Sequence, residues 1–525
     1  MPDRHPRAFE PMVLVVNIIM ATMGAIIGLQ LICYLGISTN TAIIGAMMAM
    51  IIGRIPLAIF RQFLSIHRQN LVQTAISSAT FGAANSLLLP IGIPWLMGRS
   101  DLVLPMLAGV AMAMFLDALL LYFMFDSEIY PGEGIWPHGI ATAEAIIAGD
   151  RGGKRARLLL YGLVGGLVGS YFKLPMAAFG NAFIANPWAL SMFGVGLLTR
   201  GYSKQLVDLD INTIYVPHGV MIGAGIVALF QIVVLVIKRR KVSAETHTCN
   251  YDRVRKTLGT GFVLYITIAV ILAMMTGLYT VMSPRMFAFW IMFAAIAAIV
   301  HELIVGLAAM HAGQFPAFAT ALIFLIIGMI IGFPTLALAV LVGFCASTGP
   351  AFADMGYDLK TGWILRGRGQ NHALELDGRK QQCIAALTGF TTAAVVVFAV
   401  HAMYFQQNLF PPVDRVYVAT IKAGLGNAEI GRYLLLWAIP GAIVQFLGGP
   451  TRQLGMLFGT GLLIVNPLAG WLVLAGITIR IIAIKVYGQK AQSMLYILGA
   501  GFFAGDALQS FFGSFFGSVW KLKGK

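Results

Sequence analysis

The sequence predicts an all-α polytopic membrane protein whose length allows roughly 14–16 transmembrane helices, at about 20 residues per span plus short loops. Hydrophobic residues make up 58% of the 525 residues and charged residues only 11%. A soluble domain carries about 25% charged residues, so this chain has too few charges to cover a surface exposed to water. Long, unbroken apolar runs also exclude a β-barrel, which shows short alternating segments. We therefore expect two helical bundles in a lipid bilayer, with some segments broken or re-entrant.

The apolar runs predict the helices in order along the chain. The first run begins at Met12 and is long enough to cross the bilayer. Helices are expected near residues 12–36, 40–60, 102–125, 157–174, 213–237, 257–281, 285–308, 316–332, 334–349, 383–406, 431–448, 453–470, 471–487 and 491–519. The last of these either spans once or folds back at Gly505.

Two further segments are not simple spans. Residues 70–98 contain Ser, Thr, Asn, Gly and Pro within an apolar stretch, and residues 174–200 are broken by Gly180, Asn181, Asn186 and Pro187. Interrupted helices are tolerated at membrane depth where they line a cavity or are buried in protein, and transporters place substrate sites at such breaks. Ordinary helices with polar packing residues remain the alternative.

Glycines spaced four residues apart predict close helix packing. Gly162 and Gly166 form one such pair. In lipid there is no hydrophobic drive between helices, and small residues at this spacing let two backbones approach closely.

The net charge of +15 is distributed in short loops between apolar runs. Basic loops near 151–157, 238–256 and 360–380 predict a shared cytoplasmic side and attraction to anionic lipid headgroups, so we expect no nucleic-acid partner. The loop near 241–256 divides the chain into a first bundle (1–240) and a second bundle (257–525). A multi-pass location in the cell (inner or plasma) membrane is expected, and homo-oligomerisation is left open.

A polar island interrupts the apolar pattern between Ala346 and Gln382. Its first part contains small residues and glycine with Asp354, Asp358 and Lys360. Charged groups at the mouth of a span are costly unless they face water or each other. The island therefore predicts a charged turn on a transport pathway, with a gating or structural role for Asp358 and Lys360.

Several segments resemble the oligopeptide transporter (OPT) superfamily in the same order along the chain. They are NLVQT (70–74), PHGIATAEAI (137–146), NPWALSMFGVG (186–196), DLKTG (358–362), RKQQ (379–382) and GAGFFAGDALQS (499–510). On this basis the chain is identified as a prokaryotic-type member. The resemblance implies a secondary active, proton-coupled importer of oligopeptides, peptide-like siderophores or metal–chelate complexes. It implies no cofactor, and H⁺ as the coupling ion.

The chain departs from the family pattern at two places. The loop over residues 366–378 carries a charged insert, and residues 306–320 replace an Asn-Pro motif that the family tends to have in its second half. The second departure weighs against a peptide in particular as the substrate.

Two carboxyl groups are candidates for proton coupling. Glu144 lies in a largely apolar stretch near His138, where partial desolvation suits a group that takes up and releases a proton. It could instead oppose Arg151 or Lys154. Asp354 is the second candidate, and its alternatives are a helix cap or a pair with Lys360.

Uncharged polar residues are candidates for substrate binding. Asn70, Gln73, Thr74 and Ser77 place donors and acceptors inside a membrane segment, and they suit peptide-like or carboxylate groups. His138, His311 and Gln314 are further candidates, the last two because they lie in a small-residue break between two spans. Helix–helix hydrogen bonding is the alternative for all of these residues.

The sequence predicts no catalytic or metal site. His301 and Glu302 lack a second histidine four residues on, where Val305 stands, so the zinc-helix pattern is absent. Asp117 and Asp506 lie within apolar runs, where structural pairing is expected. No ATP-binding P-loop occurs. The alternatives to secondary transport are a passive channel or facilitator for a small polar solute and, with less support, a membrane-embedded enzyme.

Overall fold

A computed structural model describes residues 4–36, 41–238, 248–314, 316–424 and 428–523. Within these ranges the fold is helical, and the only β-structure is an isolated bridge between Phe125 and Tyr130. The helices of the first half are α1 (Pro11–Leu35), α2 (Ala42–Arg54), α3 (Ile66–Phe81), α4 (Leu89–Leu96), α5 (Val103–Met124), α6 (Pro137–Arg151), α7 (Gly153–Tyr171), α8 (Met176–Ile184), α9 (Pro187–Val207) and α10 (Val216–Lys238).

The second half begins with α11 and continues to the C-terminal end. Its helices are α11 (Tyr251–Met275), α12 (Pro284–Ala312), α13 (Ala317–Ile331), α14 (Thr335–Ser347), α15 (Pro350–Leu365), α16 (His372–Gln406), α17 (Pro412–Ala423), α18 (Ala428–Arg452), α19 (Leu454–Leu463), α20 (Pro467–Tyr487) and α21 (Lys490–Lys523). Short 3₁₀ segments cover Ala58–Leu64, Ser100–Leu102 and Leu278–Thr280, and η2 (Gly82–Leu88) is a π-helix. The helix α21 continues through Gly505, so the C-terminal segment does not fold back there.

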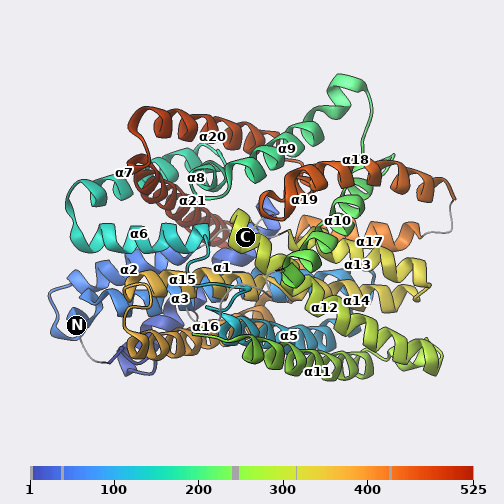
Figure 1. Ribbon diagram of the computed structural model, residues 1–525, viewed down its shortest axis with the longest axis horizontal. Coiled ribbons are helices and arrows are strands. Elements are labelled where there is room, and N and C mark those ends of the chain that lie inside the picture. The colour runs from blue at the N-terminus through green and yellow to red at the C-terminus, as the bar shows by residue number, and fades with distance from the viewer. Residues whose placement is uncertain (1–3, 37–40, 239–247, 315, 425–427, 524–525) are drawn as a thin grey trace.

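The prediction of an all-helical membrane protein is confirmed. In the described part of the chain, nine helical segments are long and apolar enough to cross a bilayer, and four shorter apolar helices of 10–17 residues accompany them. Most helices lie side by side along the long axis, with α7, α8, α9 and α20 along one edge and α5, α11 and α16 along the other (Figure 1).

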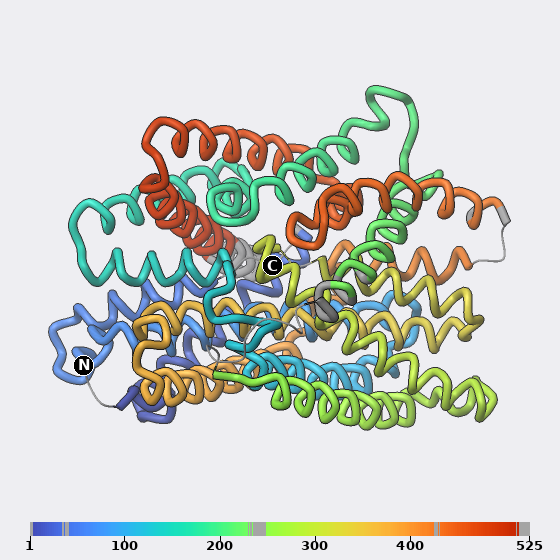
Figure 2. Tube along the Cα trace, in the orientation of Figure 1, coloured from blue at the N-terminus to red at the C-terminus, as the bar shows by residue number. Residues whose placement is uncertain are grey.

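Helices from the two halves of the sequence pack against each other. The helix α16 packs on α1 and α3, and α21 packs along α7. Figure 2 shows the red C-terminal helix beside the cyan segments of the first half. The predicted glycine packing is confirmed in α7: a Cβ atom on Gly162 would lie 2.4 Å from the Leu498 carbonyl oxygen, and one on Gly166 would lie 2.5 Å from that of Phe502. Only glycine permits this approach.

Helix breaks meet in the interior. The break between α8 and α9 contacts the C-terminal end of α12, because the Asn186 N–H donates to the Ala312 carbonyl oxygen at 2.8 Å. The start of α6 contacts the same end, since the Trp136 N–H donates to the Met310 carbonyl oxygen at 2.9 Å. The interruption expected in residues 174–200 is therefore present. Residues 66–96 instead form one helical segment, with the π-helix η2 in place of a break.

The polar island differs from its prediction as a charged turn. Residues 350–365 form the helix α15, which is almost entirely buried, and the island is non-helical only at Thr348 and Gly349 and over residues 366–371. The polar side chains of α15 bond to serines of α3, to the Gly132 carbonyl oxygen in the α5–α6 loop and to the Gly139 carbonyl oxygen of α6. Such partners make a buried helix possible because they satisfy groups that lipid would leave unpaired.

Candidate functional site

A cavity of about 90 Å³ lies where the broken helices meet. Helices from both halves of the chain line it, including α6, α8, α15, α19 and α21. Its polar lining residues are Asn85, His138, Asn181, Gln314, Tyr357 and Thr460, and its aromatic ones are Phe81, Phe193, Phe318 and Phe503. None of the lining residues carries a charged Asp, Glu, Lys or Arg side chain.

The end of α12 shapes one wall of this cavity. Gly313 ends the helix with φ at +68°, and a Cβ there would lie 2.9 Å from the Pro137 ring. This position therefore requires glycine. The Gly313 carbonyl oxygen lies 2.8 Å from His138 Nε2, so Nε2 carries the proton and donates it. The Gln314 amide also donates to this carbonyl oxygen, at 2.7 Å.

Three polar groups of the cavity residues have no hydrogen-bond partner among the described residues. They are both amide atoms of Asn85, the amide oxygen of Asn181 and the hydroxyl of Tyr357. Since buried polar groups in proteins are nearly always paired, these atoms are available to a ligand or to water. The arrangement suits recognition of amide or hydroxyl groups.

A pair of buried carboxyl groups lies on the helix that carries Tyr357. Asp354 and Asp358 are one helical turn apart on α15 and are 0% and 1% exposed. The Ser77 hydroxyl donates to Asp354 Oδ1 at 2.5 Å, and that of Ser78 donates to Asp358 Oδ2 at 3.5 Å. Neither carboxyl group forms an ion pair within the described ranges.

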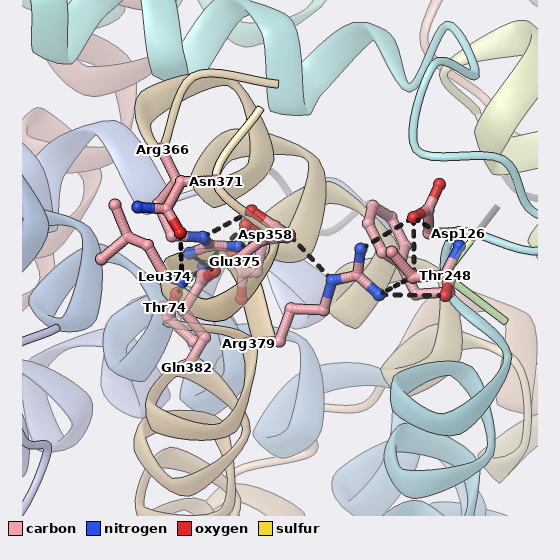
Figure 3. Close-up of polar contacts among 11 residues, drawn as sticks. Thr74, Asp126, Thr248, Asp358, Arg366, Asn371, Leu374, Glu375, Arg379 and Gln382 are labelled. Carbon is pink, nitrogen blue, oxygen red and sulfur yellow. Dashed lines mark hydrogen bonds and ion pairs between the residues drawn. The ribbon is translucent and has the colours of Figure 1, made fainter. Parts of the chain in front are cut away.

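A chain of hydrogen bonds and ion pairs extends from the backbone of Asp358 to the α5–α6 loop (Figure 3). Gln382 begins it, donating to the Asp358 carbonyl oxygen at 2.7 Å and to the Thr74 hydroxyl at 3.2 Å. Its amide oxygen accepts from Arg366 at 2.6 Å, and Arg366 pairs with Glu375 at 2.8 Å.

Arg379 continues the chain from Glu375 to the loop. Its guanidinium lies 2.7 Å from Glu375 and 3.0 Å from Asp126, and it donates to the Thr248 hydroxyl at 2.9 Å. Burial opposes ionisation of Asp126, but the Thr248 hydrogen bond and the Arg379 charge outweigh it and lower the pKa of this loop carboxyl below its ordinary value.

Comparison with protein families decides the family. The family model described as OPT oligopeptide transporter protein matches residues 11–238 and 236–517, which together cover nearly the whole chain. The chain belongs to the OPT oligopeptide transporter family. No curated protein matches it, and no solved structure does. The resemblance seen in the sequence is thus confirmed. Family membership and the apolar helices together support a multi-pass membrane protein of a transporter family.

In this OPT family member, the four polar residues predicted on α3 do not line the cavity. Gln73 donates to Asn70 at 3.0 Å and to Thr74 at 2.8 Å, so these side chains bind one another. Ser77 binds Asp354. The structure therefore places these residues beside the carboxyl pair, between α3 and α15.

The other predicted residues divide between the cavity and its surroundings. His138 and Gln314 line the cavity, whereas His311 does not. Glu144 forms an ion pair with Arg155 and accepts a hydrogen bond from Ser493 at 2.9 Å.

Lys360 does not pair with Asp354 or Asp358. Its Nζ donates to the Gly132 carbonyl oxygen at 2.7 Å and lies 4.3 Å from the centre of the Trp363 ring. The contact ties α15 to the α5–α6 loop.

Asn85, Asn181 and Tyr357 of the OPT cavity were not singled out from the sequence as binding residues. Asn85 and Asn181 lie in the two segments that the sequence marks as interrupted, 70–98 and 174–200. The sequence therefore indicated the two correct segments but not these individual residues as binding residues. Tyr357 stands three residues after Asp354, and helical spacing puts these two side chains on one side of α15. Because a turn was expected here, no helical face was considered.

Proposed function

We propose that the protein is a proton-coupled secondary transporter that imports oligopeptides, peptide-like siderophores or metal–chelate complexes across the cell membrane. One observation carries the proposal: Tyr357, which lines the cavity, lies between the buried Asp354 and Asp358 on α15. One rigid helix thereby joins a ligand cavity to a site that can hold protons.

The chemistry of the cavity supports a substrate with amide, carbonyl or hydroxyl groups. Unpartnered amide atoms of Asn85 and Asn181 can bind such groups, and four phenylalanines offer apolar contact. A volume of about 90 Å³ is smaller than the pockets of about 300–1,000 Å³ that hold drug-sized ligands. The conformation described is therefore a closed one, and α15 and its neighbours move apart when substrate enters.

The carboxyl pair supports coupling to protons. Burying an unpaired carboxylate is expensive, and among the described residues the side-chain partners of Asp354 and Asp358 are serine hydroxyls and the Gln73 amide. Protonation removes the cost and lets the closed conformation form. Asp354 suits this role better than Glu144, because Arg155 already balances the Glu144 charge.

The ionic chain through Arg366, Glu375 and Arg379 supports a gate at the end of the molecule that we place in the cytoplasm. It joins α15 and α16 to the α5–α6 loop beside the basic segment that begins α11. Basic loops of this kind remain cytoplasmic. Opening toward the cytoplasm would break these contacts, and closure would restore them.

The test is uptake into proteoliposomes with an imposed pH gradient, acid outside. The probes are dipeptides, tripeptides, and iron and nickel complexes of peptide-like chelators, each with and without a protonophore. The proposal requires at least one probe to accumulate and the protonophore to abolish accumulation. If the probe only equilibrates across the membrane and its uptake does not depend on the pH gradient, the result would indicate the alternative, a passive facilitator.

A further inference from the structure

A second pair of buried carboxyl groups lies at the start of α15, outside the cavity and the ionic chain. Asp117 of α5 and Glu302 of α12 are both 0% exposed. The Tyr265 hydroxyl of α11 lies between them, 2.7 Å from Glu302 Oε2 and 3.5 Å from Asp117 Oδ1. Three helices thus bring two acids and one hydroxyl together in the interior.

Hydrogen bonding distinguishes the two acids. Asp117 Oδ1 accepts from the Gly349 N–H at 2.8 Å and its Oδ2 from the Phe352 N–H at 2.9 Å. These are donors at the N-terminal end of α15, which favours a negative charge. The Tyr265 hydroxyl lies beside Glu302 Oε2. The other oxygen, Glu302 Oε1, is buried and has no partner among the described residues. Asp117 is therefore suited to the charged form and Glu302 to the protonated form.

No cation in the described part of the chain balances Glu302. The titratable groups that face it are Asp117, Tyr265 and Tyr130, whose hydroxyl donates to the Leu303 carbonyl oxygen at 3.3 Å. The adjacent His301 is committed elsewhere, with Nε2 2.9 Å from the Ala317 carbonyl oxygen and Nδ1 3.2 Å from the Thr348 hydroxyl. Two buried carboxylates without a cation would be very unfavourable.

We infer that Glu302 is a second proton-binding site, and that Tyr265 links it to Asp117 and thereby to the α14–α15 break. A proton from water converts the Glu302 carboxylate to the acid, and the Tyr265 hydroxyl is then free to donate to Asp117. When Glu302 is deprotonated, Tyr265 donates to Glu302 instead, and Asp117 loses one donor. The inference rests on the proposed proton coupling and names a second residue for it.

The consequence is a mechanical link between the two acidic pairs. Asp117 binds the N–H groups of Gly349 and Phe352, and Asp354 follows only two residues later on the same helix. A change in the donors to Asp117 therefore alters the anchoring of the turn that carries Asp354. Both protons would then act on the position of α15.

The test is infrared difference spectroscopy of the full-length protein in lipid nanodiscs, recorded between acid and alkaline pH. A protonated buried carboxylic acid gives a resolved C=O stretching band. Glu302→Gln is expected to abolish one such band, which Asp354→Asn leaves in place. The exposed Asp101→Asn serves as the control and is expected to leave the Glu302 band unchanged. An unchanged spectrum for Glu302→Gln would overturn the inference.

Tyr265→Phe provides a variant that keeps both acids and most of the packing. It removes one hydrogen bond to the charged form of Glu302, so the midpoint of the Glu302 band is expected to move to higher pH by about one unit. A midpoint equal to that of the wild type would overturn the link through Tyr265, even where Glu302→Gln fails to fold.

Uptake measurements separate this inference from the proposed function. If the wild type shows the Glu302 band but no probe accumulates with the pH gradient, proton coupling fails and the proton site stands without it. If accumulation depends on the gradient and survives unchanged in Glu302→Gln, coupling stands and Glu302 takes no part in it.

Discussion

The Ser77 hydroxyl donates a 2.5 Å hydrogen bond to Asp354 Oδ1 and so joins α3 to α15 in the interior of the bundle. Ser77→Ala removes this donor from a fully buried carboxyl group. A hydrogen bond to a charged group contributes about 1.5–3 kcal/mol, so the charged form becomes less favourable. We expect the pH profile of uptake to shift to higher pH by about one to two units, measured as initial rates across a pH series. Ser77→Thr keeps the hydroxyl, and a shift of equal size in that variant would contradict this explanation.

The ion pairs of Arg379 are expected to stabilise the closed protein. Arg379→Ala would leave Glu375 and Asp126 without their shared partner, and removing one member of a buried pair typically costs about 3–5 kcal/mol. Thermal unfolding in detergent should therefore show a lower Tm. The matched control is Arg99→Ala at the exposed Arg99–Asp101 pair, where such pairs contribute about 0–1 kcal/mol. Equal losses of Tm in the two variants would argue against a stabilising role for the buried ion pairs of Arg379.

Asp126 is expected to make stability sensitive to acid. Its pKa is lowered in the folded protein, so its contribution is fully present above the unfolded value of about 3.9 and is lost as pH falls through the lower folded value. Asp126→Asn lacks this contribution. The Tm difference between wild type and variant should then shrink as the pH falls below about 4. A difference that stays constant from neutral pH to acid would show that Asp126 carries no such linkage.

Gly313 is expected to tolerate no side chain. Gly313→Ala introduces a Cβ 2.9 Å from Pro137 at a residue with φ of +68°. The positive φ alone costs about 1–2 kcal/mol, and the clash adds to it at the cavity wall. Gly332→Ala is the control, because Gly332 has φ of +89° and open space around it. Thermal unfolding should show a larger loss at Gly313, and only that variant should lose uptake.

Tyr357 is expected to serve the substrate and to contribute little to stability. Its hydroxyl has no partner among the described residues, so Tyr357→Phe removes no hydrogen bond from the folded protein and should not lower the free energy of unfolding. We expect a higher KM for the transported probe with an unchanged Tm. A lower Tm with unchanged KM would assign Tyr357 to packing.

Much of the fold follows from the sequence because it depends on long apolar runs and glycine spacing. The family, the helical membrane class and the close approach at Gly162 and Gly166 were all predicted correctly. The helix α15 was not, since a stretch with Asp354, Asp358 and Lys360 is typical of a water-exposed turn. Its partners, Ser77 and Gln382, are far away in the sequence, and only the tertiary fold brings them close.

The candidate site was predicted in part for the same reason. His138 and Gln314 lie next to helix breaks that proline and glycine mark in the sequence, and both line the cavity. An ion pair was one expected alternative for Glu144, with Arg151 or Lys154 as the partner, but the structure pairs it with Arg155 of helix α7. The pairing of Glu302 with Asp117 through Tyr265 joins three separate helices, and no local pattern could have indicated it.

Proton coupling through Asp354 is tested most directly by comparing accumulation with exchange in proteoliposomes. The probe is whichever peptide or chelate complex accumulates in the wild type, and the variant is Asp354→Asn, an uncharged side chain of the same size. We predict that the variant still exchanges labelled for unlabelled probe across the membrane and no longer accumulates it with acid outside. Accumulation at the wild-type level in Asp354→Asn would contradict the central role of this carboxyl group.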